Sequence, residues 1–188
     1  MICVPPGLHL DTAAEKAHYD RHDNDPADPR YRRFLSRAAD ALMARIDPPA
    51  RGLDFGSGPG PTLSVMLEEA GYTVALYDKV YAPDPAPFNA NYDFITATEV
   101  FEHLDAPAET IELLLDSLRP GGWLIIMTKR AGDYEAFTRW HYTGDPTHIT
   151  FFSEETFRWV ARRWNLGLEI AGPDVVALCK VDQKDQHR

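Results

Sequence analysis

This chain has few cysteines, no long apolar run and fewer basic than acidic residues. Of 188 residues only Cys3 and Cys179 are cysteines, far apart and without metal-type spacing, so neither a disulfide framework nor a zinc knuckle at the N-terminal end is indicated. No stretch approaches the roughly 18 consecutive apolar residues of a transmembrane helix, and the first residues lack the basic start and apolar core of a signal peptide. We therefore expect a cytoplasmic protein that does not enter a membrane.

The excess of acidic residues limits the partners. Twenty-nine Asp and Glu residues against 19 Lys and Arg residues give a formal charge of −10 and a pI near 5.1. A field of this sign repels phosphate backbones and anionic membranes, so we do not expect nucleic acid as a substrate. The length suits one domain with a core of its own. No sequence feature indicates an oligomeric state.

A glycine-rich turn is the most informative feature. Residues 53–60 read Leu-Asp-Phe-Gly-Ser-Gly-Pro-Gly, directly behind an apolar strand predicted at 52–55 and ahead of a helix predicted at 62–70. Glycines let the backbone turn sharply and approach a ligand, and the amides that start the helix present partial positive charge. This is the place where an α/β sheet binds a nucleotide.

A second acidic position supports a bound nucleoside. Residues 72–76 alternate like a strand that ends at Tyr77-Asp78, and Asp78 lies 18 residues past Gly60. An acidic side chain at such a distance can accept hydrogen bonds from both ribose hydroxyls. A dinucleotide fingerprint would need glycine at position 61, where this chain has Pro61, so hydride transfer is disfavoured.

The residues around the turn indicate which nucleotide is bound. Asp54, two residues ahead of Gly56, suits a ligand with an ammonium group better than a pyrophosphate. The resulting Asp-x-Gly-x-Gly-x-Gly pattern resembles that of class I S-adenosylmethionine-dependent methyltransferases. The resemblance implies S-adenosylmethionine as cofactor and S-adenosylhomocysteine as product. It also implies that Asp54 attracts the methionine amino group, that Gly56, Ser57 and Gly58 approach the carboxylate and sulfur, and that Asp78 holds the ribose.

The order of predicted elements gives the fold class. A helix at 31–46 precedes the βαβ unit, and a strand at 92–96, a helix at 108–118, a strand at 123–128, a helix capped by Ser153 and an antiparallel hairpin at 168–180 follow it. Only 13 residues, three of them proline, separate Asp78 from the strand at 92–96, too few for a helix, a strand and another helix. We predict a doubly wound α/β domain at 31–181 with a mostly parallel sheet and a C-terminal antiparallel hairpin. In the strand numbering of the methyltransferase fold its order is 2-1-4-5-7-6, with the third strand missing or vestigial, and residues 182–188 form a flexible tail.

The segment after the fourth strand carries ionisable groups. Residues 98–103 read Thr-Glu-Val-Phe-Glu-His, and Glu-x-x-Glu-His resembles the segment of ubiquinone-type O-methyltransferases. The resemblance implies that Thr98 and Glu99 flank the adenine and the transferred methyl group. On a helical turn Glu99, Glu102 and His103 would lie at i, i+3 and i+4, where three ligands can converge on a divalent ion. We favour the alternative that Glu102 and His103 cap the next helix and bond back to the cofactor loop, so His103 is counted with the cofactor and no metal is predicted.

The N-terminal segment, residues 1–30, is predicted to form a lid over the cofactor. Tyr19, His22 and Asn24, with Tyr31 close behind, form a polar and aromatic cluster. Some uncharacterised family members look similar here, with a Tyr-x-x-His-x-Asn segment before paired Asp-Pro turns. The alternative is that Tyr19 and Tyr31 are core aromatics and that His22 lies in a turn.

The stretch from 129 to 150 is rich in rings and lacks a clean periodicity, and so long a loop in a compact domain is usually functional. Methyl transfer is an in-line displacement at an activated carbon, so the enzyme mainly positions an acceptor and removes its proton. Histidine suits that proton transfer at neutral pH. His148 is the first candidate for the base and His141 the second, although a histidine ahead of a helix often has a purely structural hydrogen bond.

These observations favour S-adenosylmethionine-dependent O- or N-methylation of a small-molecule acceptor. Two alternatives stay open, namely a noncatalytic module or partner subunit that binds the same cofactor, and a nucleotide-dependent dehydrogenase. Fold alone does not establish function.

Overall fold

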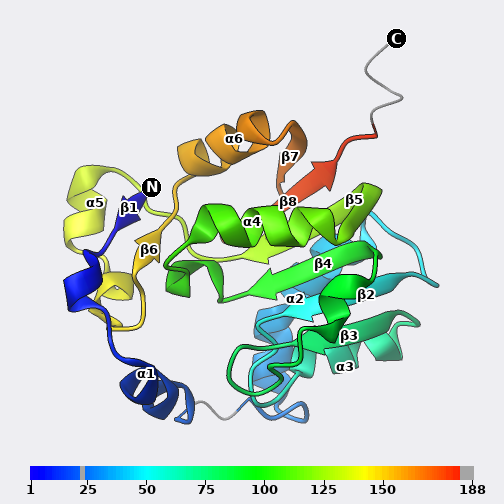
Figure 1. Ribbon diagram of the computed structural model, residues 1–188, viewed down its shortest axis with the longest axis horizontal. Helices are drawn as coiled ribbons and strands as arrows, with labels where there is room; N and C mark the ends of the chain where they lie inside the picture. Colours follow the sequence, from blue (N-terminus) through cyan, green and yellow to red (C-terminus); the bar gives the residue numbers. More distant parts are fainter. Residues whose placement is uncertain (22–23, 183–188) are drawn as a thin grey trace.

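The computed structural model describes residues 1–21 and 24–182, and these build a three-layered α/β arrangement (Figure 1). The lid candidate His22 and residues 183–188 of the tail predicted at 182–188 lie outside the described residues. The helices and strands in chain order are β1 (Ile2–Cys3), α1 (Thr12–Tyr19), α2 (Pro29–Met43), β2 (Arg51–Phe55), α3 (Thr62–Glu69), β3 (Thr73–Tyr77), β4 (Tyr92–Thr98), α4 (Pro107–Asp116), β5 (Leu118–Met127), α5 (Tyr134–Thr138), β6 (Thr150–Phe151), α6 (Glu154–Arg163), β7 (Leu166–Ile170) and β8 (Val175–Lys180). Short 3₁₀ turns occur at Pro6–Leu8, Ala86–Asn89, Phe101–His103 and His141–Gly144.

The main sheet has the order β3-β2-β4-β5-β8-β7. Strands β3, β2, β4 and β5 are parallel, whereas β8 runs antiparallel to both β5 and β7. This is the predicted order, because β2, β3, β4, β5, β7 and β8 are strands 1, 2, 4, 5, 6 and 7 of the methyltransferase fold. The predicted gap is confirmed as well, since the described stretch between β3 and β4 contains a 3₁₀ turn and one isolated bridge, Asp78 to Ala82, but no strand.

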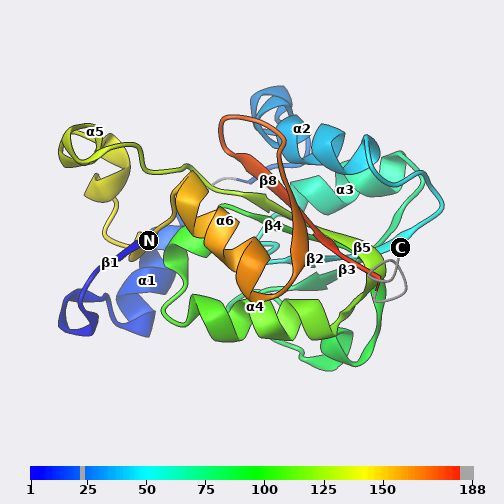
Figure 2. The same cartoon turned by 90° about the horizontal axis from the view of Figure 1, so that it is seen from above.

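The helices cover both faces of this sheet (Figure 2). Helices α2 and α3 lie on one face, and α4 and α6 lie on the other. Successive residues of a strand point to opposite faces, so Ile95 packs in the cluster under α4 and α6 while its neighbour Phe94 packs with Leu35 and Leu42 of α2. The central strands are therefore buried on both sides, as is usual for parallel sheets.

Local signals explain where most helices begin. The Ser153 side chain accepts from the Thr156 amide and the Thr156 hydroxyl accepts from the Ser153 amide, a reciprocal cap that starts α6 as predicted. Asp28 caps α2, whose first residue is Pro29. Helix α1 was not predicted, because it has no buried residue and hence no apolar stripe to reveal it.

Two further departures lie near the N-terminus and in the 129–150 stretch. Strand β1 pairs antiparallel with β6 in a separate two-stranded sheet, and α5 forms within the stretch that shows no periodicity. Both lie, with α1, beyond the carboxyl ends of β2 and β4 (Figure 1). No helix in the described part of the chain is long and apolar enough to cross a bilayer.

Candidate functional site

A cavity of about 720 Å³ opens at the carboxyl ends of the parallel strands, within the size range of small-molecule sites. Most of the predicted site residues line it, namely Tyr19, Asn24, Asp54, Gly56, Ser57, Gly58, Asp78, Thr98, Glu99, His103 and His148. His141 is not brought to this cavity. Its side chain is exposed, with Nε2 3.2 Å from Nζ of Lys129, so the geometry does not support it as a base.

The glycine turn forms a close-fitting wall of the cavity. Gly56 and Gly58 have φ of +77° and +65°, values that side chains disfavour. A Cβ atom at Gly56 would lie 2.3 Å from Val100 Cγ2, and one at Gly60 would lie 2.1 Å from the carbonyl oxygen of Asn24. The turn therefore requires glycine both for its backbone conformation and for the approach of neighbouring atoms.

Asp78 ties the second strand to this turn. Its Oδ2 accepts from the Gly58 amide at 2.9 Å, and its Oδ1 accepts from the amides of Val80 and Tyr81 at 2.8 and 2.9 Å. The Tyr77 carbonyl accepts from the Gly56 amide at 2.7 Å. Each carboxylate oxygen has two lone pairs, so Asp78 can hold the turn and still accept from a ligand in the cavity.

Asp54 is a buried carboxyl group at the floor. Its side chain is almost fully buried and accepts from the Thr96 hydroxyl at 2.8 Å and the Ser64 hydroxyl at 2.9 Å. Burial raises its pKa despite these two hydrogen bonds. A cation in the cavity would favour the ionised form, so the placement is compatible with the predicted contact to an amino group.

Glu99 stands where β4 ends, in a strained backbone. Its φ is +53°, a conformation that is costly for a residue with a side chain and that concentrates at functional sites. Its Oε1 is buried without a hydrogen-bond partner. Burial, and then the charge of Glu102, raise the Glu99 pKa to about 8. The cavity thus holds a carboxyl group with one buried oxygen that accepts no hydrogen bond.

The helical turn expected at Glu99, Glu102 and His103 is not present. Residues Phe101–His103 form a 3₁₀ turn, and the positive φ of Glu99 ends any helical continuation towards it. The expectation that Glu102 and His103 cap the next helix is also wrong, because α4 has no side-chain cap. Both side chains instead bond to the segment between β5 and β6, which lies across the carboxyl end of β4.

Glu102 is held in a fully buried network. It accepts from the Tyr142 hydroxyl in a short hydrogen bond and from the Thr128 hydroxyl at 2.8 Å. Burial raises its pKa, against the effect of these donors. Tyr142 also packs its ring on His148, with centroids 4.0 Å apart. The sequence placed Tyr142 only among the rings of the loop, and no local pattern reveals a hydrogen bond that spans 40 residues.

The two histidines have fixed ring orientations. His103 Nδ1 lies 2.9 Å from the Thr147 carbonyl and His148 Nδ1 lies 2.7 Å from the Tyr142 carbonyl. Since a carbonyl only accepts, each Nδ1 donates, and each Nε2 then carries a lone pair in the neutral ring. Burial lowers both histidine pKa values, so both imidazoles are neutral near pH 7.

Glu102, His103 and His148 also form a possible cation site. Their ligand atoms lie within 4.8 Å of one another, and a histidine whose other nitrogen donates to a carbonyl is oriented as metal-binding histidines are. The set differs from the one considered from the sequence, because His148 takes the place of Glu99. Nitrogen and carboxylate ligands of this kind suit zinc and related divalent metals.

Helix α1 covers the cavity and is fixed on both rims. Lys79 Nζ lies 2.6 Å from Glu15 Oε1, and His18 Nε2 lies 3.2 Å from Asp145 Oδ2. The Tyr19 hydroxyl donates to Glu15 at 2.7 Å, and the Tyr19 ring meets His103 edge to face. The sequence missed Glu15 and Asp145, whose partners are 64 and 127 residues away.

Residues 19–170 match a protein family described as a methyltransferase domain. The chain belongs to the class I S-adenosylmethionine-dependent methyltransferases. Over 86 residues this chain is 28% identical to the ubiquinone biosynthesis O-methyltransferase of Shewanella pealeana, and over 87 residues it is 30% identical to that of Paraburkholderia phytofirmans. The matches cover 46% of this chain but only 36% and 37% of those relatives.

Solved structures of other proteins share the fold of this chain. The 1,6-didemethyltoxoflavin-N1-methyltransferase of Burkholderia thailandensis superposes with a TM-score of 0.59 at 20% identity, over 96% of this chain and 94% of that one. A putative S-adenosylmethionine-dependent methyltransferase of Methanococcus maripaludis gives 0.55 at 15% identity, over 97% and 98%. At these identities the likeness establishes the fold.

Proposed function

We propose that this protein binds S-adenosylmethionine in the large cavity and transfers its methyl group to an oxygen or nitrogen of a small molecule. The observation that carries the proposal is that the glycine turn and Asp78 line the same cavity and are joined by a hydrogen bond. The glycines leave room for close approach of a ligand, and the orphaned Glu99 oxygen and buried Asp54 offer acceptors to a cationic cofactor. The residues that line the cavity therefore fit S-adenosylmethionine.

Each residue of the cofactor end has an assigned contact. Asp78 accepts from the ribose hydroxyls, the amides of Gly56, Ser57 and Gly58 face the carboxylate and sulfur, and Asp54 faces the ammonium group. Thr98, Glu99 and His103, together with Asn24, border the adenine and the methyl group. The bound cofactor supplies a carbon already activated by a sulfonium, so the protein mainly aligns the acceptor and excludes water.

His148 is the proposed base. Its Nδ1 donates to the Tyr142 carbonyl, which leaves Nε2 free to take a proton from an acceptor hydroxyl or ammonium. The ring lies against Tyr142, and this contact fixes its plane. Because burial lowers the His148 pKa, the ring has no proton to lose before it acts at neutral pH.

The charge of the cavity indicates which acceptors fit. Six carboxyl groups line it, from Asp54, Asp78, Glu99, Glu102, Asp105 and Asp145, and among the described lining residues a single lysine, Lys79, opposes them. Burial raises the pKa of three of these groups, Asp54, Glu99 and Glu102, and a bound cation would favour their ionised forms. Lys79 is already paired with Glu15. An acceptor with a neutral or cationic body fits this lining better than a phosphate or a carboxylate.

The relatives support both kinds of acceptor atom. The curated relatives are named as O-methyltransferases, and the Burkholderia enzyme is named as an N1-methyltransferase with its small substrate bound. We therefore propose a small-molecule acceptor in which the methylated atom is an oxygen or a nitrogen.

The test begins with binding and proceeds to turnover. We expect S-adenosylhomocysteine to raise the melting temperature, because a ligand at about 100 times its Kd adds roughly 2.7 kcal/mol of stability, and we expect NAD to leave it unchanged. Dopamine, catechol and 3,4-dihydroxybenzoate then serve as acceptors with matched rings and a positive, neutral or negative charge. Binding without turnover across broader acceptor panels would favour the noncatalytic alternative, and stabilisation by NAD alone would overturn the proposal.

A further inference from the structure

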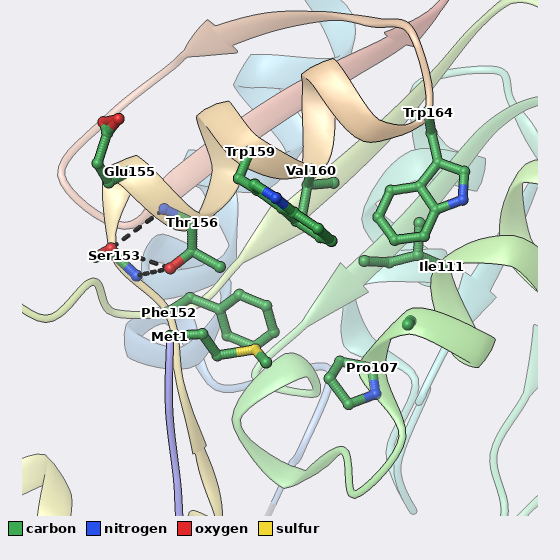
Figure 3. A pocket seen from close by; sticks show the side chains of 11 residues that line it. Met1, Pro107, Ile111, Phe152, Ser153, Glu155, Thr156, Trp159, Val160 and Trp164 are labelled. Carbon is green, nitrogen blue, oxygen red and sulfur yellow. Dashed lines mark hydrogen bonds between the residues drawn. The ribbon is translucent and has the colours of Figure 1, made fainter.

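A second cavity, of about 400 Å³, lies between helices α4 and α6 on the face of the sheet away from α2 and α3 (Figure 3). It shares no lining residue with the cofactor cavity. Its walls come from Pro107, Ala108 and Ile111 of α4, from residues 152–160 around α6, and from Trp164 and Met1. The proposed methyl transfer makes no use of it.

Two indoles form a corner of this cavity. Trp159 and Trp164 extend from the α6 side toward Pro107 and Ile111 (Figure 3). Their ring centroids are 5.8 Å apart and their planes meet at 90°. Trp159 is 53% exposed, although a large aromatic ring is normally kept from water. A rounded group placed in such a corner can contact both rings at once.

The indole faces set the charge preference of the corner, because a cation is attracted to the face of an indole. Glu155 is the only described lining residue with a charged side chain, but its Oε2 lies 3.9 Å from Arg158 Nε and its carboxylate points away from the two indoles (Figure 3). The Trp164 Nε1 donates to Glu112 at 3.3 Å, which places a carboxylate at the outer edge of the corner. Arg163 has its Cζ atom 5.4 Å from the centroid of Trp164 without lining the cavity, so this indole already attracts a cation from another side.

Apolar walls and aromatic faces without hydrogen-bonding groups suit one class of ligand. A methylated ammonium group is positive, rounded and free of donors that need partners, and it is attracted to the face of an indole within about 6 Å. An anion would meet the negative faces of the two rings. A strongly hydrated ammonium would lose water without gaining acceptors from Ile111, Pro107 or Phe152.

We propose that the cavity between α4 and α6 is a second binding site, for a small methylated ammonium compound held in the Trp159–Trp164 corner. The buried ring of Phe152 and the side chain of Ile111 form its apolar base. The Met1 side chain lines the cavity beside Phe152 (Figure 3). The site stands independently of the proposed methyl transfer.

The experiment compares choline with its uncharged isostere 3,3-dimethyl-1-butanol. The protein is first saturated with S-adenosylhomocysteine, so that the acidic cofactor cavity cannot take the cation, and the N-methyl proton signal of choline is followed by ligand-observed NMR at constant ionic strength. We expect choline to bind about tenfold more tightly than the alcohol. We expect Trp159→Leu to weaken choline at least tenfold, because it removes one of the two indole faces of the corner.

The matched control is Trp140→Leu, which removes an indole that does not line this cavity. It should leave choline binding unchanged, and circular dichroism checks that each variant is folded. Equal binding of the alcohol, no binding of either compound, or binding that survives Trp159→Leu would each overturn the proposal. None of these outcomes bears on S-adenosylhomocysteine binding, which is measured separately.

Discussion

The two ends of the large cavity are built in different ways. The cofactor end joins two neighbouring βα loops, and its decisive contacts are hydrogen bonds that the backbone amides of the glycine turn donate to the Tyr77 carbonyl and the Asp78 carboxylate, 20 or 21 residues further along the chain. The histidine end, made of Glu102, His103 and His148, is assembled by side chains from segments 26 to 44 residues apart. The first end is rigid because of local backbone geometry, and the second depends on a buried polar network. Substitutions at the first should therefore affect binding, and substitutions at the second should affect turnover.

The largest effect is expected from Gly56→Ala. The added Cβ would lie 2.3 Å from Val100 Cγ2 in a backbone with φ of +77°, so the turn must move. We expect affinity for S-adenosylhomocysteine, measured by calorimetry, to fall about 100-fold or more. Gly121→Ala is the matched control, because Gly121 has φ of +78° with no atom within 4 Å of the new Cβ. If both variants bind alike, the clash is irrelevant, whereas recovery in Gly56→Ala with Val100→Ala would confirm its cause.

Asp78→Asn comes next. The substitution keeps the size of the side chain but removes the charge that accepts three amides. Hydrogen bonds to charged groups contribute about 1.5–3 kcal/mol each, so we expect cofactor affinity to fall about 10- to 100-fold. Asp105→Asn, in the lining of the same cavity, should change affinity little. Similar losses in the two variants would show that the cavity's overall charge, rather than the position of Asp78, determines binding.

At the histidine end, Tyr142→Phe tests whether the Glu102 hydrogen-bond network affects turnover without affecting cofactor binding. The phenyl ring can keep its place on His148 while the donor to Glu102 is lost. Loss of one buried hydrogen bond costs about 1–3 kcal/mol, so we expect kcat to fall about tenfold with the Kd for S-adenosylhomocysteine unchanged. A fall in cofactor affinity equal to the fall in kcat would mean that the two ends are one unit.

Zinc tests how the histidines are used. The cluster of Glu102, His103 and His148 should bind Zn²⁺, and about 100 times its Kd should raise the melting temperature by roughly 5–10 °C. His148→Ala should abolish most of that shift. Because the ion and the acceptor proton compete for His148 Nε2, we expect zinc to inhibit turnover and EDTA to leave the basal rate intact. A rate that EDTA abolishes and Mn²⁺ or Mg²⁺ restores would make these residues metal ligands and remove His148 as base.

The same contrast explains what the sequence could predict. The glycine turn, the distance from Gly60 to Asp78 and the short stretch before β4 follow from local spacing. They were enough to predict the order of the sheet and to bring the glycine turn and Asp78 to one site. Glu102 and Tyr142 are 40 residues apart in the sequence, and their contact depends on the path of the whole intervening segment. A local periodicity in the sequence does not predict that path. Helix α1 escaped prediction because it is stabilised by ion pairs such as Lys79 to Glu15 and buries none of its residues.

The smallest effect concerns pH and Glu99, which lies where the two ends meet. Burial and then the charge of Glu102 raise the Glu99 pKa from its ordinary value of 4.5 to about 8. Between these pH values the folded protein holds a proton that the unfolded chain has released, so stability falls as pH rises through this window. Glu99→Gln removes that dependence. Without ligand or metal, we expect the melting temperature of the natural protein to fall between pH 5 and pH 8 by about 5 °C more than that of the variant.

The exposed Glu68 on α3 provides the control for this last prediction. Glu68→Gln should reproduce the pH dependence of the natural protein, because the substitution removes a carboxylate that does not line the cavity and leaves Glu99 in place. Saturation with S-adenosylmethionine should flatten the natural curve towards that of Glu99→Gln, since a sulfonium near Glu99 would favour its ionised form in the folded state. If the cofactor does not change the dependence of the melting temperature on pH, Glu99 does not contact the cofactor. Its strained backbone would then serve only the arrangement of the histidine end.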